Sequence, residues 1–349
     1  MGHDKIISSW YRLAALCLVV AFLALLLAAC GNESKTSTPS ATITGTAGTI
    51  TVVASSGNHS MYGQPVTFTA TVTDTASGAG TPTGTVNFND GSHFLGAGPL
   101  YSGTAIFTTS ALLGGSHSIT AIYGGDSNFK TSTSSAITQT VLPANTTIAV
   151  TGQSVTYKDS AQYVTLTATV TAAGAAVNEG NVTFTVIDSH ENNVGDLGWG
   201  TVTGGSASAL YSLPGGSGAS TYTIDAVYSG GDNFQTSRST GLASLTVNKA
   251  ATTTVLTFPD IYLGQDVTLT ARVTTAHGSL VNEGTVTFAV MRGYSYAATM
   301  PGTVKGDIAS AVYSLPADVV WTGIPLCADY SGGDNFLASS AECGYMRVK

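Results

Sequence analysis

The sequence contains few side chains that could carry out acid–base or nucleophilic chemistry. The segment 188–191 reads Asp-Ser-His-Glu and has the residue types of a hydrolytic site, but neighbours on one turn cannot orient one another as a catalytic triad requires. The histidines lie singly, and no His-x-x-x-His or Cys-x-x-Cys spacing of a zinc site occurs. We therefore expect no enzyme and no cofactor. The histidines that follow the N-terminal apolar segment are His59, His93, His117, His190 and His277.

One phrase of aromatic, glycine and acidic residues occurs three times, at 123–129, 228–234 and 330–336. The first copy reads Tyr-Gly-Gly-Asp-Ser-Asn-Phe, and the other two read Tyr-Ser-Gly-Gly-Asp-Asn-Phe. Glycine tolerates positive φ and Asp forms Asx turns, so we interpret the phrase as a tight hairpin loop with its Phe packed beneath. The acidic members are Asp126, Asp232 and Asp334.

The recurring aspartates also allow a second interpretation, a calcium site. In an Ig-like topology the loop after the second strand and the last hairpin loop share one end of the domain, which pairs Glu179 with Asp232 and Glu283 with Asp334. Calcium takes six to eight oxygen ligands, so two carboxylates per site are few. The first repeat has Thr83 in place of the Glu. We therefore expect turn chemistry rather than a metal site.

Aromatic side chains raise the hypothesis of a carbohydrate site, because sugar rings stack on flat, exposed side chains. Tyr294 and Tyr296 are two residues apart, hence on one face of a strand, and with Trp321 in a connecting loop they form a candidate glycan platform. The alternative is that they cover loops and sheet faces, as Tyr and Trp do in most sandwiches. Trp199 lies where the first repeat has Leu95, so we expect it in the core.

All of these residues should lie on β-strands or on the loops that join them, because apolar residues alternate with Thr through most of the chain. The phrase recurs about every one hundred residues, which is the size of one β-sandwich domain. Three blocks align at 63–73, 161–171 and 264–274, and each alternates like a half-buried strand. Each repeat has about seven such strands. The pattern predicts an all-β fold, a tandem array of three Ig-like antiparallel β-sandwich domains after an N-terminal signal segment.

Three segments of the first repeat resemble the bacterial Ig-like repeat family of exported and surface proteins. They are GQPVTFTATV from Gly63, PTGTVNFNDG from Pro82 and GSHSITAIYGGDSNF from Gly115. The other two repeats keep the strand blocks and the phrase but lose the Asp-Gly turn after the third block. The resemblance implies stalks, spacers and adhesion modules, with no shared catalytic residues.

The N-terminus has the layout of a secretory signal, with Lys5 and Arg12 before an apolar stretch at 13–29. This stretch is shorter than the ~20 residues that span a bilayer comfortably. Its end, Leu-Ala-Ala-Cys at 27–30, resembles the lipobox of bacterial lipoproteins, which implies cleavage before Cys30 and acylation of its sulfur. An uncleaved membrane helix and ordinary Ala-x-Ala cleavage are the alternatives. By the same resemblance, Gly31 in place of Asp implies an outer-membrane or surface location.

Composition excludes some partners. Only 9% of residues are charged, against roughly 25% in an average globular protein. Loss of Asp4, Lys5 and Arg12 with the signal leaves 10 basic and 19 acidic residues, a net charge of −9. Nucleic acid is therefore not an expected partner, since phosphate binding needs clustered Lys and Arg. The expected partners are the membrane, through the acylated N-terminus, and a surface protein or carbohydrate.

These features together predict a non-catalytic, lipid-anchored cell-surface protein that serves as an Ig-like structural stalk or adhesion module. A surface glycan- or ligand-binding lipoprotein is the alternative. The expected organisation is a lipoprotein signal peptide at 1–29, a flexible tether at 30–42 and Ig-like domains at 43–142, 145–248 and 251–349.

The sequence also predicts a disulfide between Cys327 and Cys343. They are the cysteines that remain once Cys17 leaves with the signal and Cys30 is acylated, and an exported segment permits the bond. The midpoint of the pair is Asn335, inside the loop between the last two strands, so the two residues should lie opposite each other with both sulfurs on the outer face of the sheet.

Overall fold

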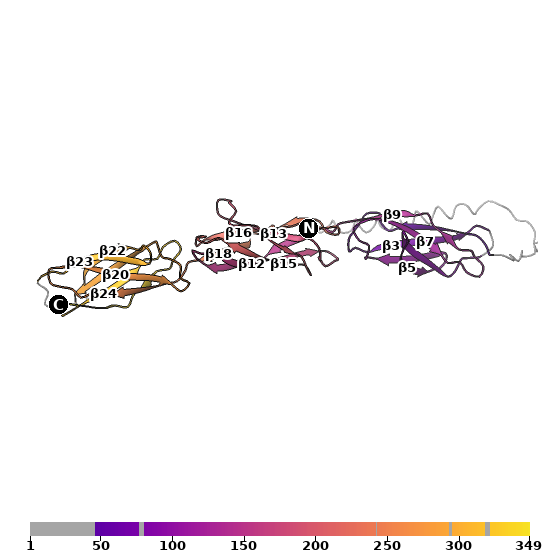
Figure 1. Ribbon diagram of the computed structural model, residues 1–349. Helices are drawn as coiled ribbons and strands as arrows, with labels where there is room; N and C mark the ends of the chain where they lie inside the picture. Colours follow the sequence, from indigo (N-terminus) through magenta and orange to yellow (C-terminus); the bar gives the residue numbers. More distant parts are fainter. Residues whose placement is uncertain (1–45, 77–79, 242, 293–294, 318–321) are drawn as a thin grey trace, which may run out of the picture. The chain divides into compact units, whose positions relative to one another are not determined.

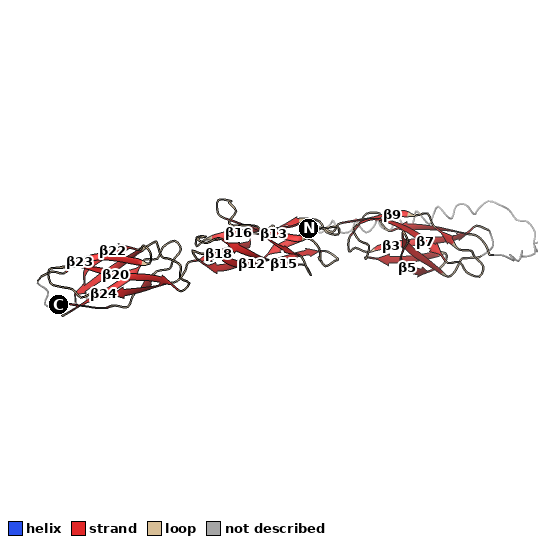
Figure 2. Ribbon diagram, in the orientation of Figure 1, coloured by secondary structure: helices blue, strands red, loops and turns tan. Residues whose placement is uncertain are grey.

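The computed structural model describes residues 46–349 except 77–79, 242, 293–294 and 318–321. All regular structure in these ranges is β-strand (Figure 2). The described part has no helix that is long and apolar enough to cross a membrane. Cys30, Tyr294 and Trp321 lie outside the described residues, as do the segments 1–29 and 30–42 that we predict to be a signal peptide and a tether. The chain divides into two units, Met1–Thr46 and Ala47–Lys349.

The alternation of apolar residues and Thr produces half-buried strands as predicted. In β3 (Val66–Asp74), Val66, Phe68, Ala70 and Val72 are buried, and the threonines between them are half-buried or exposed. β12 (Gln162–Ala172) and β20 (Asp266–Thr275) repeat this pattern. Each of these strands is the centre of a three-stranded sheet. One face of each strand covers the core and the other does not, which accounts for the alternating burial.

Module 1 comprises β1 to β9 and has two sheets with the orders β1-β3-β6 and β2-β9-β7-β4-β5, and β8 pairs with β7 (Figure 1). Most pairs are antiparallel, but β2 runs parallel to β9 because the chain crosses from the first sheet to the second after β1. The remaining bounds are β1 Thr49–Ser55, β2 Ser60–Met61, β4 Thr85–Asp90, β5 His93–Pro99, β6 Thr104–Thr109, β7 Gly115–Tyr123, β8 Ser132–Thr133 and β9 Ile137–Leu142.

Module 2 repeats this topology with the orders β10-β12-β15 and β11-β18-β16-β13-β14, and β17 pairs with β16. The parallel pair recurs between β11 and β18. The bounds are β10 Thr146–Val150, β11 Gln153–Thr156, β13 Asn181–Ile187, β14 Gly198–Thr201, β15 Ser206–Leu213, β16 Thr221–Tyr228, β17 Ser237–Arg238 and β18 Ala243–Asn248.

Module 3 has the orders β19-β20-β23 and β22-β21-β24-β25, with β26 paired to β24. A parallel bridge between Ile261 and Val348 takes the place of the parallel strand pair. The bounds are β19 Thr252–Thr257, β21 Thr285–Arg292, β22 Ser295–Thr303, β23 Ile308–Ser314, β24 Gly323–Tyr330, β25 Ser339–Ser340 and β26 Gly344–Arg347.

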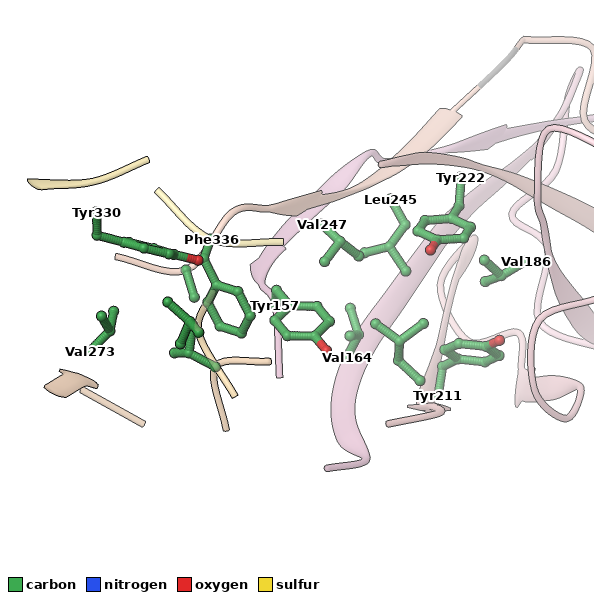
Figure 3. Packing of buried hydrophobic residues seen from close by; sticks show 14 of the residues in the cluster. Tyr157, Val164, Val186, Tyr211, Tyr222, Leu245, Val247, Val273, Tyr330 and Phe336 are labelled. Carbon is green, nitrogen blue, oxygen red and sulfur yellow. The ribbon is translucent and has the colours of Figure 1, made fainter. Parts of the chain in front are cut away.

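Three aromatic positions fill the core of every module. One Phe lies on β4, β13 or β21, and the first and last residues of the repeated phrase supply a Tyr and a second Phe. All are at most 3% exposed, and each stabilises its module by about 1.5–3 kcal/mol through burial. Figure 3 shows two of them, Tyr330 and Phe336, among other core side chains. The three sets are Phe88, Tyr123 and Phe129; Phe184, Tyr228 and Phe234; and Phe288, Tyr330 and Phe336.

The expectation that Trp199 is a core residue is wrong, because its side chain is 70% exposed. Trp199 pairs with Thr183 across β13 and β14, and the matching pair in module 1 is Asn87 with Ala97. Trp199 is therefore equivalent to Ala97 rather than Leu95. A register shift between Phe88 and Asn89 displaced the alignment that the sequence suggested.

The expected disulfide between Cys327 and Cys343 is present, with the two Cα atoms 4.4 Å apart. Leu326 pairs with Gly344, so continuing the ladder places the cysteines directly opposite each other. Leu326 and Met346 point into the core, whereas Cys327 is half-buried and Cys343 exposed. The bond therefore lies on the outer face and closes the loop that holds the third copy of the phrase.

Replacing both cysteines by Ser should lower the free energy of unfolding of module 3 by about 3 kcal/mol, because a short loop is no longer closed in the unfolded chain. Amide hydrogen exchange of the full chain measures this directly: β24 and β26 should lose protection while β16 of module 2 keeps it. Equal protection of β24 in both proteins would show that the bond contributes nothing to stability.

Candidate functional site

The repeated phrase forms the same turn in each module. Gly125, Gly230 and Gly332 have φ values of 78°, 71° and 75°, which favour glycine. The N–H that follows each glycine donates to the carbonyl of the phrase's Phe at 2.9–3.0 Å. The residue that follows is Asp126 in module 1 but Gly231 and Gly333 in the other two. The three aspartates are therefore not equivalent, although their neighbours in the sequence look alike.

In module 1 the Asp126 carboxylate holds the turn together. Its Oδ1 accepts the N–H groups of Asn128 and Phe129 at 2.8 and 2.9 Å, and its Oδ2 accepts the N–H and hydroxyl of Thr83 at 2.9 and 2.6 Å. The hydrogen bond from the Thr83 side chain is the main reason that the pKa of Asp126 falls to about 2, and the backbone donors add to it. The Asx turn expected from the sequence is thus present in this module.

Modules 2 and 3 place a carboxylate in the same space from the opposite loop. Glu179 accepts the backbone N–H of Asn233 at 2.7 Å and its side-chain amide at 3.0 Å, and Glu283 accepts the same groups of Asn335 at 2.6 and 3.5 Å. A Cβ added to Gly231 would lie 2.5 Å from Glu179 Oε1. Glycine is therefore required where module 1 has Asp126. Modules 2 and 3 thus have Glu and Gly at the two positions where module 1 has Thr and Asp. This paired exchange is the signal in the sequence from which the site could have been found.

The buried tyrosine of each phrase supports the loop that supplies the Thr or Glu. The hydroxyls of Tyr123, Tyr228 and Tyr330 donate to the carbonyls of Thr83, Glu179 and Glu283 at 2.7, 2.9 and 3.0 Å. Burial is the main reason that the pKa values of Tyr123 and Tyr330 rise to about 12. These hydroxyls therefore stay protonated donors near neutral pH.

The carboxylate pairs of the calcium hypothesis do not face each other as ligands. Both oxygens of Glu179 and of Glu283 accept N–H groups, and Asp232 and Asp334 lie exposed. Across residues 46–349, leaving aside the undescribed gaps, no group of three or more His, Cys, Asp or Glu residues could hold a metal ion. The geometry favours hydrogen bonding within the turn.

The phrase also contacts the preceding module, and we call this contact between neighbouring modules the joint. The side-chain oxygen of Asn233 accepts the N–H of Gly114 in module 1 at 2.8 Å, and that of Asn335 accepts the N–H of Ala219 in module 2 at 2.8 Å. The glutamate in turn accepts the amide NH₂ of the same Asn, which fixes the orientation of the amide. One asparagine therefore links the turn of its own module to the backbone of the module before it.

An aromatic pair completes each joint. The rings of Tyr62 and Phe234 meet edge to face with centroids 5.2 Å apart, and Tyr157 and Phe336 meet in the same way at 5.3 Å (Figure 3). Such pairs contribute about 0.5–1.5 kcal/mol beyond the buried area. The N–H groups of Tyr62 and Tyr157 each donate to a carbonyl of the last strand of their module, and the N–H of Ile261 does the same in module 3. Ile261 therefore occupies the position of these tyrosines. The sequence did not reveal the joint, because its partners lie more than one hundred residues apart, as the separation of 119 between Gly114 and Asn233 illustrates.

The other candidates contribute less. Tyr296 lies in β22 opposite Met291, and its two proposed glycan-binding partners, Tyr294 and Trp321, fall outside the described residues. The Asp188 carboxylate accepts the backbone N–H groups of His190 and Asn192 at 2.8 and 2.9 Å, so it closes a turn, and the Ser189 hydroxyl lies 3.4 Å from His190 Nδ1. This arrangement has no triad geometry.

Comparison with known proteins agrees with the fold. Residues 51–142, which lie in module 1, match the family of bacterial Ig-like domains (group 3). Comparison with curated proteins gives no match. Ig-like domain families are generally non-catalytic, and the fold supports a structural or adhesion module.

Solved structures of tandem modules resemble the chain at low identity. The chain is similar to the Escherichia coli adhesin FdeC (15% identity, 86% of this chain and 96% of that one, TM-score 0.32). It is also similar to the ectodomain fragment of ICAM-5, with 9% identity over 86% of this chain and 77% of that one and a TM-score of 0.40. The three N-terminal domains of the outer capsid protein Hoc of bacteriophage RB49 match with 13% identity over 86% of this chain and 99% of that one and a TM-score of 0.24. Likenesses this weak carry no argument about function.

Replacing Glu179 by Ala should lower the free energy of unfolding of module 2 by about 1–3 kcal/mol, because two donors of Asn233 lose their acceptor. Asp232→Ala is the matched control, because it removes an exposed carboxylate from the residue next to Asn233. It should change the free energy of unfolding by less than about 0.5 kcal/mol. Urea unfolding of the full chain provides the measurement.

The double variant Glu179→Thr with Gly231→Asp recreates the turn of module 1 and should recover most of the lost stability. An Asp232→Ala variant as unstable as Glu179→Ala would contradict this account of the turn.

Proposed function

We propose that this chain is a non-catalytic, lipid-anchored cell-surface protein whose Ig-like modules form a structural stalk or adhesion element. The observation that carries the proposal is the joint, which is built twice from the same parts. Each joint combines an aromatic pair, an asparagine hydrogen bond and a short connection, with three residues between β9 and β10 and between β18 and β19. A repeated joint of this kind suits a protein that holds its distal end away from an attachment point.

The connections themselves are bonded into the following module, which further restricts their motion. Ala144 donates its N–H to the carbonyl of Asn233 and accepts the N–H of Gln235, both at 2.8–2.9 Å. Ala250 does the same with Asn335 and Leu337 at 2.8 Å. A linker whose backbone is paired on both sides has little of the freedom of a Gly/Ser-rich chain.

Lipid attachment at Cys30 rests on the resemblance of residues 27–30 to a lipobox. Attachment there leaves the short Ser- and Thr-rich tether before the first strand, so the modules would project from the outer membrane or cell surface. Two or three acyl chains anchor a protein stably, whereas one chain does not.

Changing Cys30 to Ala should abolish labelling by a radioactive or clickable fatty acid and leave an uncleaved precursor, because the acylated sulfur is gone. Cys17→Ala is the control and should be labelled and processed as the wild type. Protease treatment of intact cells then locates the modules, which should be cleaved from the wild-type strain. Lipid that remains on the Cys30→Ala protein would exclude this anchor.

Glycan binding is a second candidate, favoured by two exposed aromatic side chains in module 2. Trp199 and Tyr163 are 70% and 72% exposed, and flat aromatic surfaces of this kind can stack on sugar rings. The platform proposed from Tyr294, Tyr296 and Trp321 in module 3 belongs to the same hypothesis.

A glycan array probed with the full chain distinguishes the two functions. For the stalk we expect no saturable binding. Binding that is lost in Trp199→Ala, or in the combined Tyr294→Ala, Tyr296→Ala and Trp321→Ala variant, would favour the lectin-like function; Tyr101→Ala, an exposed Tyr of module 1, is the control.

A further inference from the structure

The peptide unit between Leu113 and Gly114 lies at the centre of the first joint. Its N–H donates to Asn233 of module 2, and its carbonyl faces the imidazole Nε2 of His117 at 2.8 Å. Donation to a peptide carbonyl polarises the whole unit and strengthens the hydrogen bond that its N–H makes. His117 is thus a positioning residue for the joint.

Both ring nitrogens of His117 face acceptors. Nδ1 lies 2.7 Å from Asp90 Oδ2, and Nε2 faces the Leu113 carbonyl, while the side chain is only 13% exposed. Only the imidazolium can donate to both groups, because a neutral ring has one N–H. When the ring loses a proton, the donor that faces the carboxylate is retained, since a charge-assisted bond is the stronger one. The bond to Leu113 is the one that is lost.

The second joint has the same geometry with a different donor. Tyr222 stands at the position of His117, six residues before the buried tyrosine of the phrase, and its hydroxyl donates to the Gly218 carbonyl at 2.8 Å. The N–H of Ala219, in the same peptide unit, donates to Asn335. Burial is the main reason that the pKa of Tyr222 is raised above 10, so this hydroxyl stays a donor at any pH near neutrality.

We propose that His117 makes the first joint a pH-sensitive hinge: the protonated ring holds the 110–114 loop against module 2, and the neutral ring releases it, whereas the second joint stays closed. The inference goes beyond the proposed function, because it requires neither the anchor nor a surface location. Tyr222 provides the built-in comparison.

The groups around His117 set the direction of the effect. Burial, the largest single influence, lowers its pKa, but the hydrogen bonds to Asp90 and Leu113 and the charge of Asp90 together raise it above 6.5. The Asp90 carboxylate, on β4, also accepts the N–H of Ser118. His93 on β5 lines one surface pocket together with Asp90 and His117, and the uncharged Gln139 is the partner of His117 on β9. Since the folded-state pKa is raised, the stabilisation is complete below pH 6.5 and is lost as pH rises through the folded value.

Nuclear magnetic resonance of the full chain tests the hinge across pH 5–9. The Gly114 amide should shift with the same apparent pKa as the His117 ring, and its protection from hydrogen exchange, corrected for the intrinsic pH dependence, should fall roughly two- to tenfold through that pKa. The Ala219 amide should do neither. In His117→Tyr the pH dependence of Gly114 should vanish.

The wild-type titration already decides the matter if a variant fails to fold. A Gly114 amide that stays unchanged while the His117 ring titrates would overturn the proposal. An equal response of Gly114 and Ala219 in the wild-type chain would also overturn it, because pH would then act on both joints by another route. A His117→Tyr chain that folds but keeps the pH response of Gly114 contradicts it as well.

Discussion

The structure depends on a half-buried carboxylate-to-amide contact at the repeated turn. In modules 2 and 3 a glutamate accepts two N–H groups of one asparagine, and the same asparagine accepts an N–H from the preceding module. The contact therefore links the closure of each turn to the attachment of its neighbour. An asparagine without its glutamate would leave polar groups unpaired at a half-buried site, which costs more than the net contribution of a normal hydrogen bond. This coupling gives a physical reason for the Gly-Gly-Asp-Asn-Phe sequence that the phrases of modules 2 and 3 share.

Module 1 reaches the same result by a different route, which shows what the turn requires. Its carboxylate comes from Asp126 on the phrase and its partner from Thr83 on the opposite loop, whereas the other modules use a glutamate on that loop and a glycine on the phrase. A carboxylate at this place is common to both solutions. The residue that carries the carboxylate differs between the modules, because either loop can place a carboxylate here when the other loop leaves room for it. Calcium ligation explains neither the exchange nor the glycine.

Much of the fold could be predicted from the sequence, and the failures have identifiable causes. The alternation in β3 and its repeats determines which face is buried, so the strands and the opposed pair Cys327 and Cys343 followed from counting. Trp199 was misplaced because a register shift in module 1 leaves no mark on the hydrophobic pattern. The aspartates of the phrase were aligned by appearance, although the turn places Asp126 one position earlier. The joints could not be predicted, since their hydrogen bonds join residues of neighbouring modules that no local pattern relates.

The phrase acts as a joint that limits motion between neighbouring modules. Residual dipolar couplings of the isotope-labelled full chain at pH 6 test it most directly, because they report the alignment of each module independently. One alignment tensor should fit the couplings of all three modules, and Tyr62→Ala, which removes the half-buried ring of the first aromatic pair, should separate the tensor of module 1 from the other two. Three unrelated tensors in the wild-type chain would contradict it.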